Sequence, residues 1–146
     1  MGNVLQTQGK LDEAIGCYRQ AVQINREYAD AHYNLGSALR ARGKLEEAVQ
    51  SYQRVLQLRP DYAEAHGNLG GVCHEQEKAD EAIQSYRNAL ATKPDFAEIA
   101  SNLGTLFRSQ ENWDEAITFY RRALEIKPDY TQHGVKLHFF YGKHRV

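Results

Sequence analysis

The chain has 146 residues, of which 42% are hydrophobic and 25% are charged, with a formal net charge of −1. This balance gives no basic field that would gather nucleic acid, and no run approaches the roughly 18 apolar residues that a membrane span needs. The N-terminus also lacks the charged segment and apolar core of a signal peptide. The two cysteines, Cys17 and Cys73, are too few for a disulfide framework and are expected to be small buried hydrophobes within helices. We therefore expect a cytoplasmic protein without nucleic-acid or membrane partners.

The sequence repeats with a period of 34 residues. Three full units start at Ala29, Ala63 and Ala97 and align without a gap, and the segment before them aligns with the end of the same unit. A fixed period of this length is typical of stacked supersecondary units rather than of one closed core. The predicted organisation is a repeat array over 1–130, with a truncated repeat at 1–28, full repeats at 29–62, 63–96 and 97–130, and an irregular tail or partial capping segment at 131–146.

The truncated unit is predicted to hold the end of one helix and the whole of a second. Gly9 is expected in the turn between them, and the acidic pair Asp12–Glu13 is expected to open the second helix, where it complements the helix dipole. Arg26 stands where the other units have proline, so this helix is expected to run slightly longer. Because Met1 falls midway through a first helix, we expect the chain to be a fragment of a longer array.

Each full unit is predicted to be a pair of helices, because apolar residues recur at three- and four-residue spacing on either side of a break. Gly43 occupies the first of these breaks, where a left-handed backbone is easiest for glycine. Glu77 and Glu111 replace that glycine, so their turns are expected to differ or to carry strain. Prolines are expected to stop the second helices, at Pro60, Pro94 and Pro128.

Glycines recur inside the first helices, where each costs about 1 kcal/mol relative to alanine and therefore needs a reason. We expect them to let the helix axes approach at recurrent alanines, while recurrent tyrosines fill the space between neighbouring units. The glycines are Gly36, Gly70 and Gly104; the alanines are Ala14, Ala48, Ala82 and Ala116; the tyrosines are Tyr18, Tyr52, Tyr86 and Tyr120.

Leu-Gly, Asp/Glu-Glu-Ala, Tyr and Pro-Asp recur together in frame over residues 1–130. This pattern resembles the tetratricopeptide repeat, a helix–turn–helix of about 34 residues. The resemblance implies an all-α fold, a right-handed superhelical solenoid of antiparallel helix pairs. The family's usual tryptophan near the start of the first helix is His32, His66 and Ala100 here, and we expect the two histidines to act at helix interfaces.

In this family the first helices line the concave surface, and the resemblance places one stripe of each first helix there. Helical spacing independently puts these residues on one face, opposite a stripe of leucines. Asn34, Asn68 and Asn102 share one repeat position, and an amide both donates and accepts, so it can satisfy the backbone of an extended peptide. The remaining candidate binding residues are Tyr33, Ser37, Arg40, His74, Thr105 and Arg108.

This set resembles the asparagine ladder in the repeat domain of O-linked N-acetylglucosamine transferases. The alternative is that asparagine is simply common at this position in the family. Asp30, Glu64 and Glu98 are expected to make the mouth of the groove acidic, or to be an ordinary solvated face. They would repel a C-terminal carboxylate, which argues against the carboxylate clamp of the co-chaperone type of repeat.

The sequence offers no arrangement for catalysis, because it has no phosphate loop, nucleophile–histidine pairing or metal-ligand frame. We predict that it is not an enzyme and has no cofactor or metal. The predicted function is a non-catalytic scaffold that binds a protein or an extended peptide. Two alternatives stay open: a substrate-recruiting or regulatory fragment of a larger enzyme such as a glycosyltransferase, and a self-assembly module that forms a homo-oligomer through exposed array ends.

Overall fold

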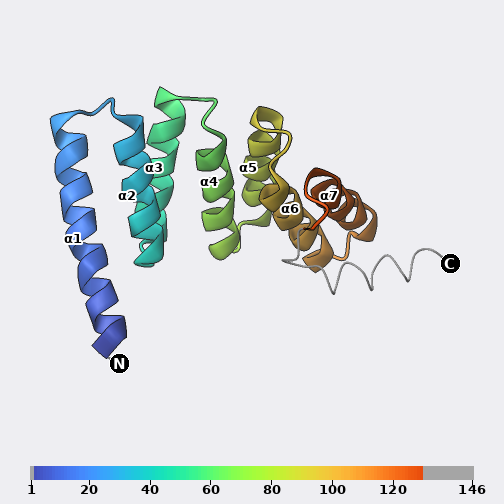
Figure 1. Cartoon of the computed structure of the whole chain (residues 1–146), viewed down its shortest axis with the longest axis horizontal. Helices are drawn as coiled ribbons and strands as arrows, with labels where there is room; N and C mark the ends of the chain where they lie inside the picture. The colour runs from blue at the N-terminus through green and yellow to red at the C-terminus, as the bar shows by residue number, and fades with distance from the viewer. Residues whose placement is uncertain (1, 130–146) are drawn as a thin grey trace. The chain divides into compact units, whose positions relative to one another are not determined.

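The computed structural model describes residues 2–129, and within them it contains seven α-helices and no strand (Figure 1). The predicted tail at 131–146 lies outside the described residues. The helices are α1 (Gly2–Ile24), α2 (Ala29–Ala41), α3 (Leu45–Leu58), α4 (Ala63–Glu75), α5 (Ala79–Thr92), α6 (Ala97–Ser109) and α7 (Trp113–Ile126).

The helices follow the period of the sequence. The first helices α2, α4 and α6 each have 13 residues, and the second helices α3, α5 and α7 each have 14. The second helices open on acidic pairs, such as Glu46 and Glu47 in α3, which complement the positive end of the helix dipole. The prediction of an all-α helical repeat fold is confirmed.

The chain divides into two compact units, residues 1–85 and 86–146, with the boundary inside α5. In the first unit α2 packs against α1 and α3, and α3 packs against α4. In the second unit α6 packs against α7, where the rings of Phe107 and Phe119 stack 5.7 Å apart. The main core of the first unit consists of Ile15, Leu35, Ala38, Leu39, Ala48, Tyr52 and Val72.

The turns inside the repeats use a left-handed residue, as the sequence predicted. Gly43 has φ 88°, and Glu77 and Glu111 take φ 62° and 60° at the equivalent places. The next N–H then reaches back to close the helix, as in the bond from Lys44 N to Leu39 O at 2.8 Å. Strain at the two glutamates is thus confirmed, because a side chain is disfavoured in this region.

The helical glycines make room for tyrosine, which corrects the expected pairing with alanine. A Cβ atom on Gly36 would lie 2.9 Å from Tyr52 Cε1, and one on Gly104 would lie 2.7 Å from Tyr120 Cδ1. Each tyrosine comes from the second helix of the same repeat. The glycine therefore provides a flat seat for an aromatic ring inside the repeat.

Three expectations for the truncated unit were wrong. Gly9 is not in a turn, because α1 runs unbroken from Gly2 to Ile24, and Asp12–Glu13 consequently lies within a helix. A glycine inside a helix costs about 1 kcal/mol relative to alanine, which the unbroken backbone hydrogen bonds of α1 tolerate at Gly9.

Arg26 does not lengthen α1, which ends at Ile24, one period before the end of α3 at Leu58. The side chain of Asn25 replaces proline as the stop signal. Its Oδ1 accepts a hydrogen bond from Glu27 N at 3.1 Å, which gives the backbone an alternative to the next helical turn.

Cysteine burial was predicted correctly for only one of the two residues. Cys73 is buried in α4, but Cys17 is exposed on α1. Ser51 and Ser85 occupy the position of Cys17 in later repeats and are both 8% exposed. Ser51 and Ser85 belong to repeats that have a first helix to pack against. The described part of the truncated unit has no such helix, so Cys17 stays exposed.

Candidate binding surface on the first helices

The first unit has a pocket of about 400 Å³ on the predicted binding stripe. Helix α2 contributes Ser37 and Arg40 to it, and helix α4 contributes Asn68 and Glu75. Three of these four residues are sequence-predicted candidates, and the structure brings them together across adjacent repeats. Glu75 belongs to the same stripe but was not among the candidates.

The guanidinium of Arg40 bridges the two helices. Its Nε and Nη2 donate to Glu75 Oε1 at 2.7 and 2.6 Å, and its Nη1 lies 3.5 Å from Asn68 Oδ1. A Cβ atom on Gly71 would come within 2.6 Å of Nη2, so the absent side chain lets the guanidinium lie on the α4 backbone. This role of Gly71 was not predicted from the sequence. The one hint in the sequence was that a second glycine follows Gly70.

Asn68 is held by neighbours from the preceding repeat. Its Nδ2 donates to the hydroxyl of Tyr33 at 2.8 Å, while its Oδ1 faces Arg40. Tyr33 in turn stacks on Tyr62 with ring centroids 5.0 Å apart. The amide thus has a fixed orientation, whereas Asn34, at the equivalent position of α2, is exposed.

The acidic mouth predicted at Asp30 is partly neutralised. Asp30 Oδ1 accepts a hydrogen bond from the hydroxyl of Tyr62 at 3.0 Å and lies 3.9 Å from Arg59 Nη1. Burial of the Tyr62 phenol, together with its hydrogen bond to Asp30, raises the pKa of Tyr62 to about 12. The sequence analysis missed Tyr62 and Arg59, whose guanidinium lies 4.7 Å above the tyrosine ring.

Two candidate hydroxyl residues have structural partners. Ser37 shares a hydrogen bond of 3.0 Å with the hydroxyl of Tyr52, and Thr105 shares one of 2.8 Å with Tyr120. Burial raises the pKa of Tyr52, so its phenol stays neutral and can keep this bond. The position one residue after the helical glycine therefore anchors the core tyrosine as well as facing the surface.

The other candidates lie on the same stripe of their helices. His74 is exposed near the end of α4 in the first unit. Asn102 and Arg108 are half-buried on α6, together with Thr105, and belong to the second unit. The structure thus gathers Ser37, Arg40 and Asn68 around one pocket, with Tyr33 hydrogen-bonded to Asn68 beside it, while the α6 candidates belong to the second unit.

The histidines at the tryptophan position, in α2 and α4, hydrogen-bond to the turn that precedes each of these helices. Nε2 of His32 lies 3.0 Å from the carbonyl oxygen of Arg26, and Nε2 of His66 lies 2.9 Å from that of Pro60. A carbonyl can only accept, so Nε2 carries the proton in both rings. Each histidine therefore ties its helix to the turn before it, while the expected role at a helix interface stays a prediction.

No three histidine, cysteine, aspartate or glutamate side chains within residues 2–129 come together in a way that could hold a metal ion. His133, His138 and His144, the three histidines of the tail, lie outside the described residues. No helix of the described chain has both the length and the apolar character to cross a membrane.

Comparison with known proteins identifies the fold. Two family models, both described as tetratricopeptide repeat, match residues 1–63 and 61–129. No curated protein sequence was found to match the chain.

Among solved structures, a crystal structure of MamA is similar with a TM-score of 0.80 and 27% sequence identity, over 90% of this chain and 77% of that one. A second MamA crystal structure gives 0.77 and 27%, over 91% and 73%. A MamA fragment from Desulfovibrio magneticus RS-1 gives 0.81 at 21% identity, over 97% and 80%, which shows the fold alone. Because the two family models together match residues 1–129 and the helices agree with them, the chain belongs to the tetratricopeptide-repeat family.

Proposed function

We propose that the chain is a non-catalytic scaffold that binds an extended peptide segment of a partner protein along α2 and α4. The observation that carries this proposal is the pocket of about 400 Å³ on the exposed stripe of these helices. Its walls supply both donors and acceptors: the guanidinium of Arg40, the carboxylate of Glu75 and the amide of Asn68. A peptide backbone presents the complementary groups at regular spacing.

Electrostatics favour backbone recognition over capture of a single charge. Arg40 and Glu75 form a neutral pair, with side chains 31% and 43% exposed. Neither charge is left to attract a ligand ion strongly, but both can still hydrogen-bond to a neutral amide. The resemblance to the asparagine ladder of O-linked N-acetylglucosamine transferases supports the same chemistry. Of the two ladder amides in the first unit, Asn34 is the exposed one and Asn68 is half-buried.

The test starts from a peptide-array screen with the purified chain, followed by calorimetry on the tightest peptide. Asn34→Ala combined with Asn68→Ala removes two amides, and each net hydrogen bond contributes about 0.5–1.5 kcal/mol. We expect the affinity to fall by about tenfold or more, with helicity unchanged by circular dichroism. Asn102→Ala tests the second unit separately.

The matched control is Gln23→Ala, which removes an exposed amide from α1, away from the pocket. It should leave the affinity unchanged. If the asparagine double variant bound its best peptide as tightly as the wild type does, the amides would be family background and the proposal would fail. The enzyme-fragment and self-assembly alternatives remain predictions of the sequence.

A further inference from the structure

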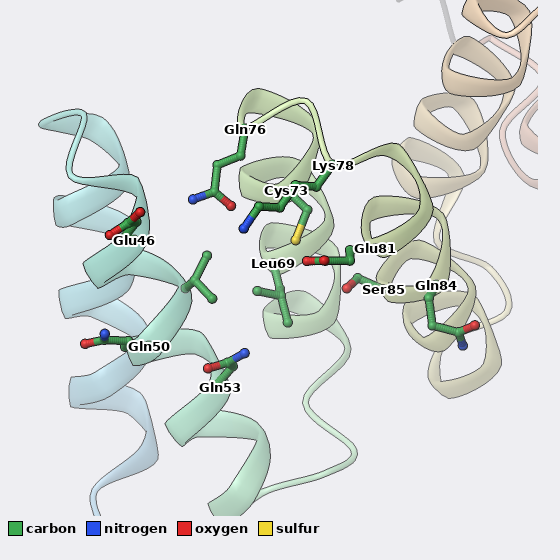
Figure 2. Close-up of a pocket in the computed structure, with 11 residues that line it drawn as sticks. Glu46, Gln50, Gln53, Leu69, Cys73, Gln76, Lys78, Glu81, Gln84 and Ser85 are labelled. Atoms are coloured by element: carbon green, nitrogen blue, oxygen red, sulfur yellow. The ribbon is translucent and has the colours of Figure 1, made fainter.

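We propose that the first unit carries a second, separate binding groove, which takes a short extended peptide with an aliphatic side chain beside a lysine or arginine. The groove has a volume of about 510 Å³ and is formed by α3, α4 and the beginning of α5 (Figure 2). This volume lies within the usual range of about 300–1,000 Å³ for ligand sites. The proposal goes beyond the proposed function, because none of its residues belongs to the stripe described above.

The two sites use different faces of α4. Asn68, Gly71 and Glu75 face the first pocket or its arginine, whereas Leu69, Cys73 and Gln76 line the groove. Positions four residues apart on a helix share a face, and the Leu69/Cys73 pair is offset from the Gly71/Glu75 pair. One helix therefore separates two surfaces that can be changed independently.

The floor of the groove is apolar. Val49 of α3 and Leu69 and Cys73 of α4 all line it, and Figure 2 draws Leu69 and Cys73 on the same helix. Cys73 is 4% exposed, and burial raises the pKa of its thiol. The thiol is therefore neutral at physiological pH and acts as an apolar surface. Such a floor suits a branched aliphatic side chain, whose transfer from water is favourable.

Neutral amides stand around this floor. Gln50 and Gln53 come from α3, and Gln76 directly follows the end of α4. Figure 2 shows Gln53 and Gln76 on opposite sides of the space. Gln50 and Gln53 are exposed, so they can rotate to meet a ligand. Each amide donates and accepts, which fits the N–H and C=O groups of an extended backbone.

The charges on the rim favour a cationic ligand. Glu46 of α3 and Glu81 of α5 line the groove together with Lys78. Two carboxylates and one ammonium leave a charge of −1, and none of the three takes part in a salt bridge within the described residues. A lysine or arginine beside the aliphatic side chain would balance this charge, whereas an acidic neighbour would be repelled.

The test uses three capped pentapeptides: Ser-Lys-Leu-Lys-Ser, Ser-Glu-Leu-Glu-Ser and Ser-Lys-Ser-Lys-Ser. Binding is measured by calorimetry at low salt, because the rim charges are exposed and screened by ions. We expect the first peptide to bind at least tenfold more tightly than either of the others. Absence of binding by the first peptide up to millimolar concentration, or equal binding of all three, would overturn the proposal.

Three variants locate the site. Gln50→Ala combined with Gln53→Ala changes only exposed residues and should weaken the first peptide by about tenfold, whereas Gln23→Ala on α1 should have no effect. Asn34→Ala should also have no effect, which separates this proposal from the first. If Asn34→Ala weakened binding and the glutamine variant did not, the peptide would lie on the α2–α4 stripe and no second groove would be needed.

Alkylation of the two thiols gives an independent readout. Cys73 borders the groove and Cys17 lies exposed on α1. Because the Cys73 thiol is buried and neutral, its reaction with N-ethylmaleimide is slow and is followed over hours. A saturating amount of the Lys-Leu-Lys peptide should slow it several-fold further and leave the reaction of Cys17 unchanged. Equal rates for Cys73 with and without the peptide would contradict occupancy of the groove.

Discussion

Two residues in the turns adopt backbone dihedral angles that side chains disfavour. Glu77 and Glu111 hold φ near 60° at the place where Gly43 has φ 88°. The closing hydrogen bonds are as short at the glutamate turns as at the glycine turn, with Lys78 N to Cys73 O at 2.8 Å. The glutamate turns therefore keep the geometry of the glycine turn, and the steric strain is confined to the backbone of the glutamate itself.

Relieving this strain should stabilise the protein. Glu77→Gly and Glu111→Gly are each expected to raise the free energy of unfolding by about 0.5–1 kcal/mol, since glycine avoids the steric penalty but loses more chain entropy. The converse change, Gly43→Ala, should lower it by about 1 kcal/mol. Urea denaturation followed by circular dichroism measures all three. Destabilisation by both glycine substitutions would show that the carboxylates contribute more than the strain costs.

The residue scale also marks a limit of prediction from the sequence. The glutamates could be recognised because the repeat frame placed them where glycine was expected. The stop at Asn25 could not, because proline was absent and the stop depends on a side-chain hydrogen bond to Glu27 N. Such a bond competes locally with the helix and leaves no periodic signal.

At the scale of the helices, the contact between a helical glycine and a tyrosine ring sets how closely the two helices of a repeat pack. Gly104 lies against Tyr120, whose hydroxyl also bonds Thr105 and which is 3% exposed. The ring is held at both ends, so it has little freedom to move away from a new methyl group. Gly36 and Tyr52 repeat the arrangement in the first unit.

Gly104→Ala should therefore destabilise the fold by about 1–3 kcal/mol, the usual cost of overpacking a core. Gly16→Ala provides the matched control, because it is an exposed helical glycine with no atom within 4 Å of the added Cβ. That change should stabilise by up to about 1 kcal/mol through helix propensity. Chemical denaturation measures the free energy of unfolding of both variants. Equal changes would mean that Tyr120 can move away from the added methyl group and that the contact is not tightly packed.

The sequence predicted most of the helices but less of the site. Helices α2 to α7 follow the period closely, since apolar spacing, acidic first turns and prolines all agree on their limits. The continuous α1 was missed, because the period implied a partner helix that the described part of the truncated unit does not supply. The stripe of candidates could be predicted from helical spacing, but the contacts of Arg40 with Glu75 and of Asn68 with Tyr33 join different repeats. Those depend on side-chain conformations that no pattern encodes.

On the scale of the whole chain, the repeats expose surfaces rather than enclose one site. In the first unit, the pocket at Arg40 and the groove at Cys73 lie on different faces of α4. The second unit repeats the stripe on α6 with Asn102, Thr105 and Arg108. The proposed peptide binding would use these exposed surfaces of α2, α4 and α6.

The most direct test of peptide binding along α2 and α4 is a titration of the isotope-labelled chain, followed by NMR, with the tightest peptide from the array. The side-chain amide signals of Asn34 and Asn68 should shift in a saturable manner, while the signal of Gln23 should stay in place. Backbone signals of α2 and α4 should shift together with them. Saturable shifts confined to other helices, with the signals of Asn34 and Asn68 unmoved, would contradict the account.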